Sequence, residues 1–175
     1  SCSNIIEVKR VQLIAESLAT IENANIKWVH FGNGPLMKSL INFCERNIKN
    51  NIDYNFLGRI SNFELFSYYK NNYIDLFINL SASEGIPVSI MEALSFGIPV
   101  LATNVGGTQE IVNNKNGFLI NSNPSVEEVG HIINKFLQLS QTKKDKMRLE
   151  AYQNWEKNYN AEKNYNLFSK EIASL

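Results

Sequence analysis

The stretch that decides the fold is residues 75–93, which read DLFINLSASEGIPVSIMEA. Its first part is an almost unbroken apolar run, as expected of a strand that is covered on both faces in a parallel sheet. A glycine and a proline follow, and Pro87 suits the first turn of the helix that comes next. Two carboxylates, Glu84 and Glu92, therefore flank the point where the strand passes into the helix. The stretch predicts a strand–turn–helix unit with an anion site at the helix start.

Strand and helix signals alternate on both sides of this unit. Short apolar runs predict strands at 26–31, 52–57, 74–80, 99–102 and 117–120. Periodic or capped segments predict helices at 8–21, 36–48, 61–69, 87–96 and 108–112, and from residue 125 the chain is helical with breaks near 140–142 and 158–161. The β/α unit repeats about six times. This order predicts an α/β fold, a Rossmann-like doubly wound parallel sheet of about six strands with C-terminal helices.

Composition excludes several classes of protein. The 175 residues suit one domain, 1–175, with a real core, and 17 basic residues balance 17 acidic ones, which argues against a nucleic-acid partner. Cys2 and Cys44 fit no metal or redox spacing, which favours a reducing cytoplasm. We find no membrane-spanning run and no signal peptide. Because the chain opens at Ser1 without a methionine, we expect it to be a piece of a longer protein.

Ligands of doubly wound sheets bind beyond the carboxyl ends of the strands, so those ends are where site residues are sought. Lys9 is expected to follow the first strand and open a helix, so that it can reach a phosphate there, although a solvated first-turn lysine is the simpler interpretation when Lys9 is taken alone. Gly85 lets a ligand approach the backbone, and the amides of residues 85–88 should face it. Glu84 and Glu92 could equally cap or decorate the helix. His30 is expected to be a packed core histidine and His131 an exposed one.

An ordered set of short motifs resembles the signature of retaining glycosyltransferases of the GT-B fold, closest to family 4, the glycosyl transferases group 1. The motifs are SEGIP at 83–87, EA at 92–93, GIPV at 97–100, AT at 102–103, VGG at 105–107 and EIV at 110–112. Lys9, GNGP at 32–35, FLG at 56–58 and DLFI at 75–78 fall in the family's order as well. Each motif is weak by itself, and GNGP is a poor dinucleotide fingerprint, but the ordered set spans nearly the whole chain.

The resemblance implies the C-terminal, donor-binding half of a two-domain enzyme. Glu84 would lie by the donor sugar as the catalytic candidate, in an orienting or electrostatic role, while Glu92 would hold the ribose hydroxyls and Lys9 would neutralise the diphosphate. The implied donor-binding positions are Asn4, Lys9, Gly32, Gly34, Gly58, Arg59, Ile60, Ser83, Gly85, Ile86, Pro87, Val88 and Glu92. The turn at 58–60 would contact the base. No metal or other cofactor is implied, because basic side chains and amides stabilise the leaving group in this family.

One position departs from the family's pattern. Members commonly carry a Gly-Arg pair with the arginine five residues before the phosphate-binding lysine, and here Ser3 and Asn4 occupy that pair. One positive charge on the diphosphate is therefore lacking unless Arg10 or Arg59 substitutes for it.

The function expected from the resemblance is transfer of a sugar, with retention, from a UDP, GDP or ADP sugar to a glycan or lipid-linked acceptor in bacterial surface polysaccharide synthesis. The acceptor domain would precede Ser1, so the chain alone should bind nucleotide and transfer no sugar. Helices at 141–175 would cross to that domain and leave aromatic side chains exposed. Any contact with the inner face of the plasma membrane would come through the preceding half. The alternatives are a GT-B sugar-nucleotide epimerase and a non-catalytic nucleotide-binding module.

Overall fold

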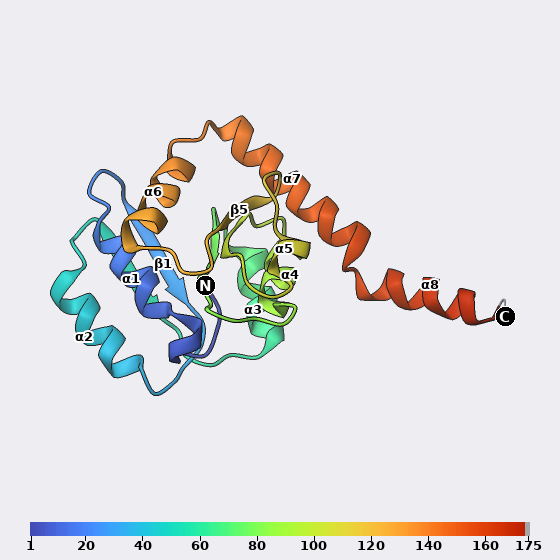
Figure 1. Ribbon diagram of the computed structural model, residues 1–175, viewed down its shortest axis with the longest axis horizontal. Coiled ribbons are helices and arrows are strands. Elements are labelled where there is room, and N and C mark those ends of the chain that lie inside the picture. The colour runs from blue at the N-terminus through green and yellow to red at the C-terminus, as the bar shows by residue number, and fades with distance from the viewer. Residues whose placement is uncertain (174–175) are drawn as a thin grey trace.

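The computed structural model describes residues 1–173, and strands and helices alternate along most of them (Figure 1). The strands are β1 (Ile26–His30), β2 (Ile52–Phe56), β3 (Phe77–Asn79), β4 (Val100–Thr103) and β5 (Gly117–Ile120). The helices are η1 (Glu7–Lys9, a 3₁₀ turn), α1 (Val11–Ala19), α2 (Met37–Asn47), α3 (Asn62–Asn71), α4 (Val88–Ser95), α5 (Thr108–Ile111), α6 (Val126–Leu137), α7 (Gln141–Asn158) and α8 (Ala161–Ala173). All strand pairs are parallel, so the predicted α/β class is confirmed.

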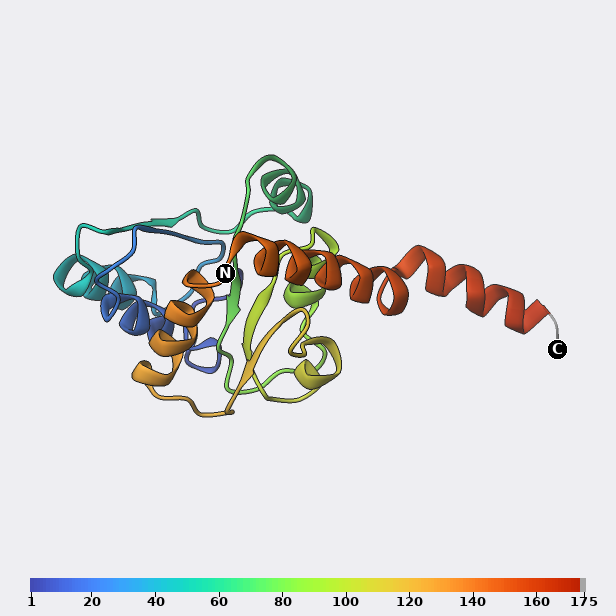
Figure 2. The same cartoon turned by 90° about the horizontal axis from the view of Figure 1, so that it is seen from above.

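The described residues hold five strands in place of the predicted six or so. They form two sheets, β1-β2 and β3-β4-β5. The N-terminal residues run beside β1, where the Ser3 amide donates to the Phe31 carbonyl at 2.9 Å and the Phe31 amide donates to the Ser1 carbonyl at 3.0 Å. This pairing amounts to a single bridge between Cys2 and Phe31, which is too short to form a strand. The N-terminus consequently lies at the centre of the molecule, between the two sheets (Figures 1 and 2).

A cleft of about 340 Å³ lies between the facing edges of the two sheets. Trp28 and Val29 of β1 line one side, and Phe77 and Ile78 of β3 line the other. It also includes residues 25 and 72–75, which precede β1 and β3. The cleft therefore opens at the amino ends of the strands, on the far side of the sheets from the edge at which ligands of this architecture bind.

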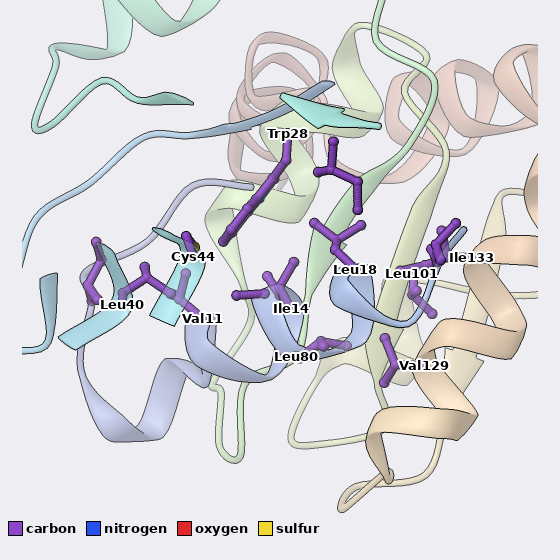
Figure 3. Packing of buried hydrophobic residues seen from close by; sticks show 14 of the residues in the cluster. Val11, Ile14, Leu18, Trp28, Leu40, Cys44, Leu80, Leu101, Val129 and Ile133 are labelled. Atoms are coloured by element: carbon purple, nitrogen blue, oxygen red, sulfur yellow. The ribbon is translucent and has the colours of Figure 1, made fainter. Parts of the chain in front are cut away.

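Helices cover both faces of the sheets, and β4 shows this most clearly. Its residues 100–103 are all buried. Leu101 packs into a core with α1, α2 and α6, whereas Val100 and Ala102 pack into a second core with α3, α4 and α7. Successive side chains of a strand point to opposite faces, so one short strand serves both cores. Figure 3 shows the first core, in which Ile14, Leu18 and Val129 converge with Leu101.

The two C-terminal helices differ in how they are supported. Helix α7 packs on α4 through the buried Ala151, and the Tyr159 hydroxyl donates to the Glu110 carbonyl at 2.8 Å. Helix α8 projects away from the rest of the chain (Figures 1 and 2). Its Tyr165 and Phe168 are 76% and 60% exposed. The prediction that aromatic side chains of the last helices stay exposed is confirmed.

Replacing Leu101 by alanine should lower the free energy of unfolding by about 2–5 kcal/mol, because it opens a cavity in a core that is closed on all sides. Leu101 is completely buried, whereas Leu149 on α7 is 56% exposed. The matched variant Leu149→Ala should change stability by no more than about 0.5 kcal/mol. Urea unfolding followed by circular dichroism measures both, and equal losses would contradict the position of Leu101 in the core.

Candidate functional site

An ion pair joins two segments at the carboxyl ends of the strands. Lys9 ends η1, and Glu84 lies in the loop between β3 and α4. The Lys9 ammonium donates to both oxygens of the Glu84 carboxylate, each at 2.8 Å. The loop is held against η1 by its backbone as well, since the Ala82 amide donates to the Val8 carbonyl at 2.7 Å. Two of the predicted site residues, 75 positions apart, are thus in direct contact.

The Glu84 carboxylate is well enclosed, with 11% of its side chain exposed. Asn79, the last residue of β3, donates its amide to Oε1 of Glu84 at 3.2 Å, while its own Oδ1 accepts from the Ser81 amide at 3.0 Å. Burial pushes the pKa of Glu84 upward, but hydrogen bonds from Lys9, Ser81 and Asn79, together with the lysine charge, outweigh burial and leave that pKa below its usual value. The carboxylate is therefore held in its charged form.

Arg10 is engaged by backbone carbonyls. Its guanidinium donates to the carbonyls of Leu80 at 2.6 Å, Ser81 at 2.9 Å and Ser122 at 2.7 Å, and also to Oδ1 of Asn123 at 3.1 Å. Burial lowers the pKa of the guanidinium. Arg10 thus ties the start of α1 to the ends of β3 and β5, while Arg59 is exposed on the turn after β2.

Arg10 also has an unusual backbone. Its φ of 47° lies in the left-handed region. Among the described residues, Arg10 is the one non-glycine residue with a positive φ. This conformation costs about 1–2 kcal/mol for a residue with a Cβ. Arg10 is both the C-cap residue of η1 and the N-cap residue of α1. Its strained backbone therefore sets the angle between the two helices.

The turn at 105–107 packs against the loop that carries Glu84. Gly106 has a φ of 50°, and a Cβ there would lie 1.9 Å from the Glu84 carbonyl oxygen. The Gly107 amide donates to the Gly85 carbonyl at 2.8 Å. Gly106 thus combines an unusual backbone angle with a close approach, and the close approach is made by the Glu84 loop.

The start of α4 leaves free donors beside the ion pair. Pro87 is the N-cap residue and offers no side-chain hydrogen bond, and the amides of Val88 and Ser89 have no acceptor among the described residues. A Cβ placed on Gly85 would meet nothing within 4 Å. Ile86 and Val88 are more than half exposed. An anion could therefore reach the helix start from solvent, next to Lys9.

Glu92 lies on α4, and its carboxylate faces α3. Asn62, the first residue of α3, donates its side-chain amide to Oε1 of Glu92 at 2.9 Å. Burial raises the pKa of the Glu92 carboxyl. The two acids of the opening stretch thus have different surroundings, because Glu84 is paired with a cation and Glu92 is not.

The predicted glycine turns at 32–34 and 58–60 contact the chain itself. The Gly32 amide donates to the Gly58 carbonyl at 2.7 Å, and both residues have positive φ, 137° and 71°. A Cβ on Gly32 would lie 1.8 Å from the Ser3 carbonyl oxygen, and one on Gly34 would lie 2.3 Å from that of Ile5. Gly58 has open space at its Cα. The close approach at Gly32 and Gly34 is thus made by the chain's own backbone.

The remaining predicted donor-binding positions are all at least partly open to solvent. Asn4, Ser83 and Arg59 are exposed, and Ile60 is half-buried. His30 is completely buried, and burial, with the N-terminal charge, lowers its pKa to about 3, while His131 is exposed, as predicted for both. Within residues 1–173 no three His, Cys, Asp or Glu side chains gather in a way that could hold a metal ion.

Two site residues were missed by the sequence analysis, Asn79 and Asn62. Asn79 was passed over as part of a nearly apolar strand, although a single amide in such a run was a usable signal. Asn62 lies between Ser61 and Glu64, the two residues that form the capping box of α3, and nothing in its local sequence distinguishes it.

Comparison with known proteins assigns the class. The fold is that of the C-terminal half of a GT-B glycosyltransferase, and the model of the family described as glycosyl transferases group 1 matches residues 1–166. The chain belongs to this family. It is 31% identical to the O-antigen biosynthesis glycosyltransferase WbnH of Escherichia coli over 130 residues, which cover 73% of this chain and 33% of WbnH.

Two solved structures illustrate the fold. The crystal structure of Anabaena HepE in complex with UDP matches with a TM-score of 0.81 and 22% identity, over 99% of this chain and 47% of HepE. The C-terminal domain of LpcC from Francisella tularensis, a group 1 family protein, matches with a TM-score of 0.77 and 21% identity, over 91% of this chain and 85% of that domain. The chain spans about a third of the length of the curated relatives that it matches. In the described part of the chain, no helix has the length and apolar character that crossing a bilayer requires.

Removing the Arg10 side chain should destabilise the fold. We expect Arg10→Ala to lower the free energy of unfolding by about 1.5–3 kcal/mol, the usual contribution of hydrogen bonds from a charged group. Arg10→Gly should lose less, because it also removes the cost of the left-handed backbone. Denaturant unfolding measures both variants against Arg46→Ala, an exposed arginine on α2. A loss in Arg46→Ala as large as that in Arg10→Ala would contradict the bridging role.

Stability should depend on pH through Glu84. Its pKa is lower in the folded than in the unfolded chain, so its contribution is fully present above the unfolded value of about 4.3 and is lost as the pH falls through the folded value. Glu84→Gln should be less stable than the parent at pH 7, and this difference should shrink toward pH 3. Thermal melts across this pH range test the prediction, with Glu45→Gln on α2 as an exposed control. A pH-independent difference would count against the ion pair.

Proposed function

We propose that this chain binds the nucleotide sugar of a retaining glycosyltransferase that builds a bacterial surface polysaccharide. The observation that carries the proposal is the Lys9–Glu84 ion pair beside the open start of α4, in a chain of the group 1 family. The pair supplies a cation for a diphosphate and a carboxylate for a sugar at one point. The name of WbnH, an O-antigen biosynthesis enzyme, supports the class of acceptor.

The diphosphate would take the place of Glu84 as the partner of Lys9. In the free chain both carboxylate oxygens lie on the lysine, so the ammonium already sits in an anion-binding geometry. A phosphate next to Lys9 can also accept from the free amides at the start of α4. Once released by Lys9, Glu84 keeps its hydrogen bond from Asn79 and can turn to the hydroxyls of the sugar.

The nucleoside would lie toward α3. Glu92 carries a negative charge with no cation among the described side chains, and the two hydroxyls of a ribose are donors that suit it. The turn at Gly58–Ile60 would contact the base through its backbone. UDP is the first nucleotide to test, because structures of HepE with UDP-glucose and of TarM with UDP share this fold.

The chemistry would be substitution at the anomeric carbon with retention. The bond from that carbon to the phosphate oxygen breaks, and the acceptor hydroxyl bonds to the carbon from the same face. The hydroxyl proton passes to the departing phosphate. Lys9 and the helix-start amides would stabilise the charge on that phosphate, so we propose no metal in this role. Glu84 would orient the sugar or stabilise positive charge on it.

The acceptor would bind to another part of the full polypeptide, which we propose precedes this chain. The short span of the chain relative to its relatives supports this. The exposed aromatic residues of α8 are the proposed contact with that part. In this arrangement, the chain alone binds nucleotide and transfers no sugar.

Calorimetric titration with UDP, GDP, ADP and FMN tests the proposal. One of the three diphosphates should bind and FMN should not. Lys9→Ala and Glu92→Ala should each weaken binding by about 10-fold or more, since each removes a hydrogen bond to a charged group.

Lys38→Ala and Glu45→Ala, exposed residues on α2, are the matched controls and should bind as the parent does. Unchanged affinity in both site variants would remove the proposed site. Preference for FMN would favour a binding module of another type.

A further inference from the structure

Asn62 makes the one hydrogen bond that the Glu92 side chain receives within residues 1–173. Its amide nitrogen lies 2.9 Å from Oε1, and Oε2 has no donor among the described side chains. A carboxylate can accept about four hydrogen bonds, so most of the capacity of Glu92 is unused. The group is half-buried beside the exposed Asn62, and no cation pairs with it among the described side chains, so a ligand can offer it further donors.

The position of Asn62 is fixed by local structure. Ser61 caps α3 in a complete capping box, in which its amide donates to Glu64 at 2.8 Å and the Glu64 amide donates back to its hydroxyl at 3.3 Å. Further along the same face of α3, Phe66 and Tyr69 each pack on Phe96, the residue that follows α4, with ring centroids 5.5 Å apart in each pair. The two helices are thus held in register where Asn62 meets Glu92.

The terminal torsion of a glutamate is soft, so an unheld carboxylate rotates freely. A hydrogen bond at Oε1 removes that freedom and presents Oε2 in one direction. Two adjacent hydroxyls of a ribose can then donate to a preoriented acceptor without the entropy cost of ordering it.

We propose that Asn62 is a positioning residue that holds Glu92 for the ribose diol and thereby sets the preference of this chain for ribonucleotides over 2′-deoxyribonucleotides. This inference rests on the proposed function and assigns a specificity role within that site. Asn62 lies two residues after the Gly58–Ile60 turn, so one short segment between β2 and α3 would serve both base and ribose.

The experiment compares the affinity for the preferred nucleoside diphosphate, UDP being tried first, with that for its 2′-deoxy form. The parent should prefer the ribonucleotide by about 10-fold, the usual effect of one hydrogen bond to a charged group. Asn62→Ala should reduce this preference to about 2- to 3-fold, mainly by weakening the ribonucleotide complex. Asn71→Ala, the same change at the exposed far end of α3, should keep the preference of the parent.

A double-mutant cycle separates positioning from a general structural effect. In a Glu92→Gln background, Asn62→Ala should no longer change the preference, because the group that it orients is gone. An undiminished preference in Asn62→Ala would overturn the inference while the proposed function stands. So would an equal loss in Asn71→Ala. A parent chain that binds none of the diphosphates would overturn the proposed function and this inference together.

Discussion

The site depends on how the start of α1 is fixed to the ends of the strands. Arg10 makes this connection by donating to three backbone carbonyls, two after β3 and one after β5. Carbonyl groups just beyond the carboxyl ends of parallel strands have no hydrogen-bond partner within the sheet. A guanidinium has five N–H donors, so it can satisfy several of them at once. Lys9 is the preceding residue, so the same interaction brings its ammonium to Glu84. The charge that would meet a diphosphate is therefore placed by a neighbour that does not face the ligand.

The two acids of the opening stretch are separated in role by their surroundings. Glu84 is charged and paired, and it is supported by Asn79 and by the glycine turn beneath it. Glu92 is unpaired apart from one amide, and burial disfavours its charge. A ligand that is anionic at one end and rich in hydroxyls next to it would satisfy both, since it offers a partner for Lys9 and donors for Glu92. This complementarity is the physical basis for reading the site as one for a nucleotide sugar.

The glycine motifs of the chain lie at turns, but different motifs allow contact with different segments. At Gly106 the positive φ and the absence of a side chain allow close contact with the Glu84 loop. At Gly32 and Gly34 the space that a side chain would take is filled by carbonyls of Ser3 and Ile5. The same property, the absence of a Cβ, allows close packing of the Glu84 loop in one case and of the N-terminal segment in the other.

The sequence by itself determined the features that are set by neighbours along the chain. The apolar run before residue 80, the proline that precedes α4 and the Ser61–Glu64 capping box act within a few residues, so pattern alone locates β3, α4 and α3. The family's motifs likewise singled out Lys9 and Glu84, which the structure brings into contact. Tertiary structure alone decided the contacts that join distant segments: Lys9 with Glu84, Arg10 with the carbonyls of Leu80, Ser81 and Ser122, and Asn62 with Glu92. These pairs are 30 to 112 residues apart, and no local signal orders them. The number of strands was also decided by the tertiary structure. The N-terminal segment pairs with the chain beside β1 through a single bridge, so it does not form a sixth strand.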